Sequence, residues 1–128
     1  MPTMFTCLFI AMLLPFVPRM FTFRAQMQRG FNNHEPRRQQ ATLTGLGARA
    51  VGAHQNSFEA LLLFACAVMI AYASQVDSII SGQLSIVFVA CRVFYIALYL
   101  ADMPSARSSI WIIGFGVTLA LAGARWIF

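Results

Sequence analysis

Charged residues are scarce in this sequence, and their scarcity excludes an ordinary soluble domain. Only 10% of the 128 residues are charged, whereas 59% are hydrophobic. Soluble domains carry roughly 25% charged and 45–50% apolar residues. The composition therefore predicts an integral membrane protein, and the length allows a single domain over residues 1–128.

Lysine is absent, so arginine supplies all nine basic side chains. Six of them fall in one window between the first two apolar segments: Arg19, Arg24, Arg29, Arg37, Arg38 and Arg49. Nucleic-acid binding is disfavoured, because these arginines adjoin apolar segments and no soluble domain presents them. They fit either a topology signal for membrane insertion or contacts with anionic lipid headgroups.

Paired cysteines are also lacking. Cys7, Cys66 and Cys91 each lie in an apolar run, and no CxxC pair exists, which argues against disulfide and metal roles. His34 and His54 form no metal-binding spacing such as HExxH. We therefore predict no metal site and expect the thiols to behave as small apolar side chains.

Four apolar stretches have the length of membrane-spanning helices, about 20 residues each. They predict helices over residues 4–23, 45–74, 79–101 and 106–127. Pro15 and Pro18 are expected to kink or stop the first helix, and Thr44 is a candidate cap for the second. Since no basic segment precedes the first stretch, we expect a retained helix rather than a signal peptide.

The predicted fold class is all-α, an integral membrane four-helix bundle. Four helices enclose only a small core, so oligomerisation is expected. The first loop holds most of the positive charge, the third contains Arg107, and the second has no arginine. The positive-inside rule then places the first and third loops in the cytoplasm and both termini on the opposite side.

Polar residues on two of the predicted helices share a face. On the second helix the shared face holds Arg49, Gly52, Ala53, Asn56, Glu59 and Leu63. On the third helix, Arg92, Tyr95 and Tyr99 are spaced three and four apart. Arg92 lies about 14 Å from its helix end, a depth at which a charge needs a partner. We expect Glu59 to be its neighbour, directly or through a ligand.

A structural ion pair that fixes helix register would explain Glu59 and Arg92 alone. It would not require the amide of Asn56, the two tyrosines, or Arg107 at the same end of the bundle. Tyr95 and Tyr99 also fit an interfacial aromatic belt. Taken together, these residues predict a polar cleft open to the cytoplasm. Several arginines and one carboxylate suit a small anion that also carries an amine, such as a peptide-like molecule with two carboxylates.

Two stretches resemble a known family. HQNSFEALLLF, with RA five positions before it, resembles the second-helix signature of the MAPEG family, the membrane-associated proteins in eicosanoid and glutathione metabolism. RVFYIALYLADMPSAR is similar to the family's third helix and following loop, and NNHEPR resembles the bacterial branch. The resemblance covers all four helices. It implies a homotrimer in the bacterial inner membrane, with glutathione bound as co-substrate between neighbouring subunits.

By matching position, the resemblance implies roles for single residues. Those implied to bind glutathione are His54, Asn56, Glu59, Arg92, Tyr95 and Tyr99. Arg107 resembles the arginine that stabilises the thiolate. Two positions depart from the pattern: Gly52 stands where many members have arginine, and Ala60 where some have an aromatic residue. Arg49, one turn before Gly52, is expected to reach into the gap and join the glutathione contacts.

Two function classes follow. The first is a membrane glutathione transferase or peroxidase acting on lipophilic electrophiles or lipid hydroperoxides. The second is a non-enzymatic trimer that binds lipid headgroups or a partner protein through Arg37 and Arg38. A channel or transporter is disfavoured, because the polar face ends midway through the helices.

Overall fold

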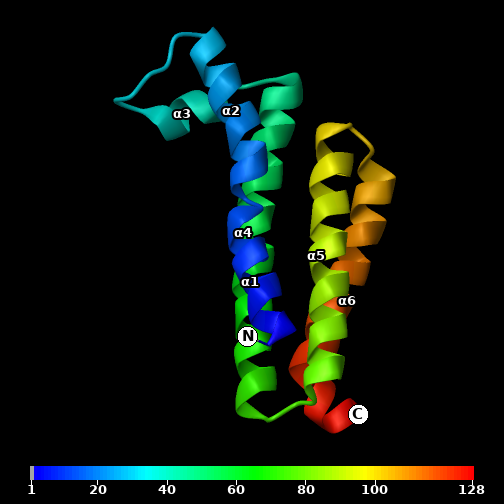
Figure 1. Ribbon diagram of the computed structural model, residues 1–128. Coiled ribbons are helices and arrows are strands. Elements are labelled where there is room, and N and C mark those ends of the chain that lie inside the picture. The colour runs from blue at the N-terminus through cyan, green and yellow to red at the C-terminus, as the bar shows by residue number, and fades with distance from the viewer. Residues whose placement is uncertain (1) are drawn as a thin grey trace.

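The computed structural model describes residues 2–128, and its regular elements are all helices (Figure 1). In chain order they are α1 (Thr3–Leu13), α2 (Phe16–Gln28), α3 (Pro36–Ala41), α4 (Gly45–Ala73), α5 (Ser78–Leu100) and α6 (Pro104–Ile127). The segment Thr3–Gln28, α4, α5 and α6 are each long and apolar enough to cross a membrane. The predicted all-α class is confirmed, and the last three spans begin and end within two residues of the prediction.

The first span is interrupted at a proline, as predicted. The helix stops at Leu13, and a new one begins at Phe16, with Pro15 between them in helical conformation. Pro15 has no backbone N–H, so it cannot continue the hydrogen-bond ladder of α1. The prediction was wrong about the end of this span: α2 continues to Gln28, five residues beyond residue 23.

Gln26 explains why α2 extends into the polar connection. Its side chain is fully buried. The Nε2 atom donates to the Pro36 carbonyl at 3.1 Å and to Gln39 Oε1 at 3.2 Å. The Oε1 atom accepts from Arg19 Nη1 at 3.2 Å and from Gln40 Nε2 at 3.4 Å. These bonds fasten α3, which the sequence did not predict, to the end of α2.

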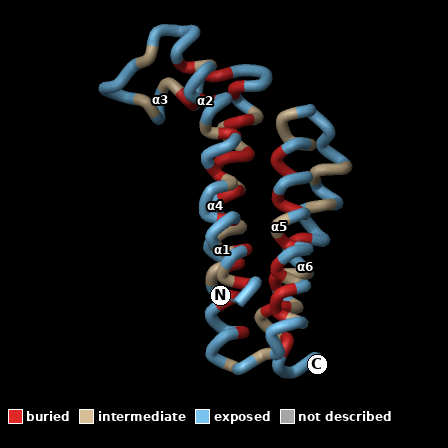
Figure 2. The backbone as a smooth tube through the Cα atoms, in the orientation of Figure 1, coloured by how far each residue is buried: buried red, intermediate tan, exposed pale blue. Residues whose placement is uncertain are grey.

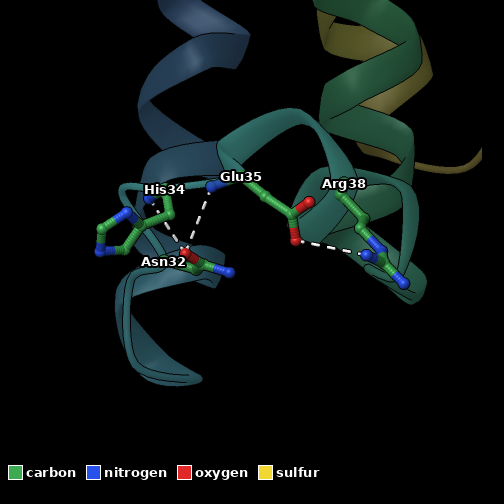
Figure 3. Close-up of polar contacts among 4 residues, drawn as sticks. All are labelled: Asn32, His34, Glu35 and Arg38. Atoms are coloured by element: carbon green, nitrogen blue, oxygen red, sulfur yellow. Dashed lines mark hydrogen bonds and ion pairs between the residues drawn. The ribbon is translucent and has the colours of Figure 1, made fainter.

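The loop between α2 and α3 contains a turn closed by a side chain. Asn32 Oδ1 accepts from the backbone N–H of His34 at 3.0 Å and of Glu35 at 3.3 Å (Figure 3). A side-chain acceptor of this kind closes a turn without help from a glycine. Arg38 Nη1 lies 3.3 Å from Glu35 Oε2, so one charge of the loop is paired locally.

The core lies where α1, α4, α5 and α6 meet. Phe64 of α4 stacks on Phe88 of α5, with ring centroids 3.9 Å apart and planes 12° from parallel. Buried residues line the facing sides of α4 and α5, whereas their outer sides are exposed (Figure 2). Large apolar side chains cover the outer surface of the whole bundle, for example Phe9, Leu62, Ile79, Ile112 and Leu119. Such a surface suits lipid or a neighbouring protomer.

Helix contacts depend on small residues and on caps. A Cβ added to Gly114 of α6 would lie 3.3 Å from Cys91 Cβ of α5, so the two helices approach closely. Asp77 caps α5 by accepting from the backbone N–H of Ile79 and Ile80. Thr44 precedes α4 as predicted, but its hydroxyl makes no cap and accepts from Arg29 instead.

We predict that Phe64→Ala destabilises the bundle by about 3 kcal/mol, because it removes the stacked partner of Phe88 and leaves a cavity. This value is at the low end for soluble proteins, since lipid already solvates apolar side chains in the unfolded bundle. Equilibrium unfolding in mixed micelles measures it. Leu62→Ala, two residues away and 66% exposed, is the control, and equal effects of both variants would contradict the assigned core.

Candidate functional site

A buried arginine forms the centre of a polar cluster between α4 and α5. Arg92 is only 5% exposed, although it lies within a membrane-spanning helix. Its Nη2 atom donates to Asn56 Oδ1 at 2.9 Å, and Asn56 Nδ2 donates to Glu59 Oε2 at 3.2 Å. Asn56 therefore accepts a hydrogen bond from the guanidinium through Oδ1 and donates one to the carboxylate through Nδ2. In residues 2–128 no ion pair links Glu59 to Arg92 directly; Asn56 joins them.

The cluster continues toward the α3 end of the bundle as two tyrosines between two arginines. The Arg92 guanidinium carbon lies 4.1 Å from the Tyr95 ring centroid. Tyr95 meets Tyr99 edge to face, with centroids 5.7 Å apart. The Arg107 guanidinium carbon then lies 4.3 Å from the Tyr99 centroid. The first and last of these contacts pair a cation with the negative face of a ring, and the last holds Arg107 beside the cluster without neutralising its charge.

These positions bear on the aromatic-belt alternative. Tyr95 is 5% exposed and Tyr99 is half-buried, and both rings face arginines rather than the outer surface of the bundle. A belt residue presents its ring to the lipid headgroup region. The burial of Tyr95 therefore disfavours the belt for that residue.

Gly52 makes room for the Tyr99 ring. A Cβ at position 52 would lie within 2.7 Å of Tyr99 Cζ and closer still to the hydroxyl oxygen. No side chain fits at position 52 while Tyr99 keeps this conformation. Gly52, where many family members have arginine, is therefore the residue that this packing requires, because Tyr99 fills the space that a larger side chain would need.

Arg49 does not enter the space beside Gly52. Its Nε atom donates to the Leu100 carbonyl at 3.3 Å, and its Nη1 atom lies 3.9 Å from Asp102 Oδ2. These contacts tie the beginning of α4 to the turn between α5 and α6, which precedes Arg107. Arg49 therefore holds the α5–α6 turn in place next to the cluster and makes no hydrogen bond or ion pair with the cluster residues.

His54 lies on a different face of α4. Its ring is buried, and Nδ1 is 2.7 Å from the Pro15 carbonyl oxygen. Because a carbonyl only accepts, Nδ1 carries the proton and donates. His54 also meets Phe58 edge to face at 5.1 Å. Within one protomer it holds α4 against the α1–α2 junction and does not contact the Asn56 cluster.

A cleft of about 70 Å³ opens beside the cluster. Its lining residues are Asn56, Glu59, Ala60, Leu63, Phe88, Arg92, Trp111, Gly114, Phe115 and Thr118. The Asn56 end is polar and charged, and the rest is apolar. Ala60 lies in this lining, so an aromatic residue there would occupy space that the cleft uses. The cleft therefore joins a charged end to an apolar wall.

The wall that α6 contributes to the cleft was not predicted from the sequence. Trp111 and Phe115 stack with centroids 5.4 Å apart and planes 11° from parallel, and both line the cleft. A signal was present: the two aromatics are four residues apart and share a helix face with Gly114 and Thr118. Small residues between large ones on one face indicate a close helix contact beside a recess.

The cleft in one protomer is too small for a tripeptide. Pockets that hold ligands of that size have about 300–1,000 Å³, and a water molecule takes about 30 Å³. One protomer therefore supplies only part of a peptide-sized site.

Within residues 2–128, no group of three or more His, Cys, Asp or Glu residues lies close enough together to hold a metal ion.

The fold and the cluster together define a helical membrane protein with an arginine-rich polar site near one end of its bundle. A family model matches residues 3–125, nearly the whole chain, and the chain belongs to the MAPEG family. No significant match to a curated protein or to a solved structure accompanies it. Membership supports, at the level of the family, a membrane activity of the glutathione transferase or peroxidase kind, or a related one.

We predict that Gly52→Ala costs about 1–3 kcal/mol of stability, because the new methyl group overlaps the Tyr99 ring. In a Tyr99→Ala background the same change should cost almost nothing, and a double-mutant cycle measures the difference. Gly116→Ala is the control, since a Cβ at Gly116 meets nothing within 4 Å. If Gly52→Ala is as harmless as Gly116→Ala, the packing of Tyr99 against Gly52 is wrong.

Proposed function

We propose that this chain is a membrane glutathione transferase or peroxidase that activates the thiol of glutathione against lipophilic electrophiles or lipid hydroperoxides. The observation that carries the proposal is the continuous cluster from Glu59 through Asn56 and Arg92 to Arg107, beside a cleft with an apolar wall. It offers complementary groups for a charged peptide and an apolar surface for its reaction partner.

The donor and acceptor set fits glutathione, which has an ammonium, two carboxylates, two amides and a thiol. Glu59 is exposed and accepts one hydrogen bond from Asn56, so oxygen lone pairs remain for an ammonium group. Arg92 uses one of its five donors on Asn56, which leaves others for a carboxylate. We propose that Tyr95 and Tyr99 line the same site, and that Arg49 borders it.

Arg107 is the proposed catalytic residue. In residues 2–128 its guanidinium makes no hydrogen bond or ion pair and rests on the Tyr99 ring, so its donors are free. A thiol of pKa about 8.5 is only a few per cent ionised at neutral pH. A guanidinium within hydrogen-bond distance stabilises the thiolate, and the proton leaves to water. Each pKa unit of that effect corresponds to about 1.4 kcal/mol.

The apolar wall suggests where the second substrate enters. Leu63, Trp111 and Phe115 are exposed on the outer side of the cleft, where a membrane would supply lipophilic molecules. The charged end lies toward the arginine-bearing loops. An electrophile dissolved in lipid and a peptide dissolved in water would therefore approach the same cleft from different sides.

The proposal includes an assembly and an orientation. Because the cleft of one protomer is smaller than a tripeptide needs, we propose that a neighbouring subunit of a homotrimer completes the site. His54, which faces the α1–α2 junction in its own protomer, contributes to glutathione binding only through that assembly. We also propose a bacterial inner-membrane location, with the arginine-rich loops cytoplasmic and both termini on the opposite side.

The experiment that tests the proposal is a glutathione titration of the purified, detergent-solubilised protein. Heat of binding reports complex formation, and ultraviolet absorbance reports thiolate. Saturable binding with thiolate near pH 7 supports the proposal. Binding without thiolate retains the anion site and removes the chemistry. An absence of binding at millimolar glutathione contradicts both.

We predict that Arg107→Ala abolishes the thiolate signal and leaves folding and oligomeric state unchanged, because the side chain makes no hydrogen bond that holds the bundle together. Arg37→Ala removes an equal charge from an exposed position of α3 and serves as the control. The absorbance titration distinguishes them. Full thiolate formation by Arg107→Ala would show that another group supports ionisation.

We predict a different effect for Asn56→Ala. This change removes the side chain that joins Arg92 to Glu59, so glutathione affinity should fall about ten-fold or more. The thiolate formed at saturating glutathione should stay close to the wild-type level, because Arg107 is untouched. Calorimetry measures the affinity and absorbance the plateau. Unchanged affinity would exclude Asn56 from the glutathione site.

A further inference from the structure

A second polar recess lies between the end of α2 and the beginning of α4, away from the Asn56 cluster. It has a volume of about 470 Å³ and shares no residue with the cleft described above. Its lining residues are Phe21, Arg24, Ala25, Gln28, Arg29, Leu43, Thr44, Leu46 and Gly47. We call this recess the basic groove. No step of the proposed reaction uses it.

The basic groove carries positive charge that the chain does not neutralise. Arg24 is exposed and makes no hydrogen bond or ion pair within residues 2–128. Arg29 donates to the Thr42 carbonyl at 2.9 Å and to Thr44 Oγ1 at 3.2 Å, which leaves three of its five donors free. None of the four acidic residues lines the groove. Two guanidinium groups without a carboxylate favour an anion.

Arg29 is held in place before any ligand binds. Its two hydrogen bonds fasten the guanidinium to the connection that leads into α4. A guanidinium fixed in this way loses little freedom when it binds an anion, and its planar fork matches the oxygens of a phosphate. Arg24 lies more than one turn earlier on α2, on the groove side with Phe21 and Gln28.

The groove also has an apolar part. Phe21 and Leu46 line it and remain 39% and 44% exposed. Leu46 lies at the beginning of one segment long and apolar enough to cross a membrane, and Phe21 lies seven residues before the end of another. A ligand that suits this place has an anionic head and an apolar tail, because the groove offers both surfaces side by side. Anionic phospholipids have that chemistry, and basic pockets between helices at this depth bind their headgroups.

The two arginines of α3, Arg37 and Arg38, do not share these properties. Arg38 pairs with Glu35 at 3.3 Å (Figure 3), and neither Arg37 nor Arg38 lines the groove. The sequence predicted headgroup contacts as one possibility for all six arginines between the first two apolar segments, and the non-enzymatic alternative relied on Arg37 and Arg38. The folded chain instead brings Arg24 and Arg29 into a recess of ligand size.

We propose that the basic groove binds one anionic phospholipid, with its phosphodiester between Arg24 and Arg29 and its acyl chains along Phe21 and Leu46. Charge complementarity supports the headgroup position, and the exposed apolar side chains support the tail position. The volume of about 470 Å³ falls in the range of about 300–1,000 Å³ that small ligands occupy. This inference does not depend on glutathione chemistry.

The test compares lipid binding by the whole purified protein and two charge-matched variants. Native mass spectrometry from detergent counts bound phosphatidylglycerol against phosphatidylcholine of the same acyl chains. We expect wild-type protein to retain one phosphatidylglycerol at least about ten-fold more tightly than phosphatidylcholine, and Arg24→Gln to lose most of that preference. Arg37→Gln removes the same charge outside the groove and should keep it. Arg24→Lys, which keeps the charge, should keep part of it.

Several outcomes would overturn the proposal. Equal losses in Arg24→Gln and Arg37→Gln would show diffuse attraction to the whole basic surface. Complete displacement of phosphatidylglycerol by millimolar inorganic phosphate would show a phosphate site with no role for the acyl chains. A change of oligomeric state in Arg24→Gln would show that a second copy of the chain covers the groove. A weaker glutathione affinity in that variant would assign the groove to the glutathione site.

Discussion

The hydrogen bond from Arg92 to Asn56 is the interaction on which the site depends. A guanidinium that is 5% exposed inside a membrane span is costly unless a protein group satisfies it. Asn56 supplies that group from α4 at 2.9 Å, and its own Nδ2 donates a hydrogen bond to Glu59 Oε2. This bond fixes α4 against α5 at one depth. Tyr95 and Tyr99 follow Arg92 on the same helix face and carry the cluster from this bond to Arg107.

Gly52 contributes by leaving space. It makes no side-chain contact itself, and the missing side chain lets the Tyr99 ring pack against α4. The Tyr99 ring occupies the space that any Cβ would need, and Arg107 rests on that ring at 4.3 Å. The position of the proposed catalytic arginine is therefore coupled to α4 through an aromatic ring. In a protein with a larger residue at this position, Tyr99 and Arg107 would have to lie elsewhere.

The cleft and the basic groove lie on different helices, and the cluster from Arg92 to Arg107 extends from the cleft toward the end of the bundle that holds the groove. The cleft uses α4, α5 and α6, and the basic groove uses α2 and the beginning of α4. Both combine arginine with exposed aromatic or aliphatic side chains. That combination fits the region where a membrane meets water, because molecules there present a charged and an apolar part together. The opposite end of the bundle carries no comparable group of arginines.

Hydrophobic length, proline chemistry and helical spacing are local properties, so the sequence predicted the existence of four spans, an interruption at proline in the first, the shared face of Asn56 and Glu59, and the family. It did not determine partners across helices. Arg49 was expected beside Gly52 but reaches Leu100, the ring of His54 turns to Pro15, and Gln26 fastens an unpredicted α3 to α2. Only the tertiary structure decided these contacts, because a long polar side chain can reach several acceptors and the packing of neighbouring helices selects one.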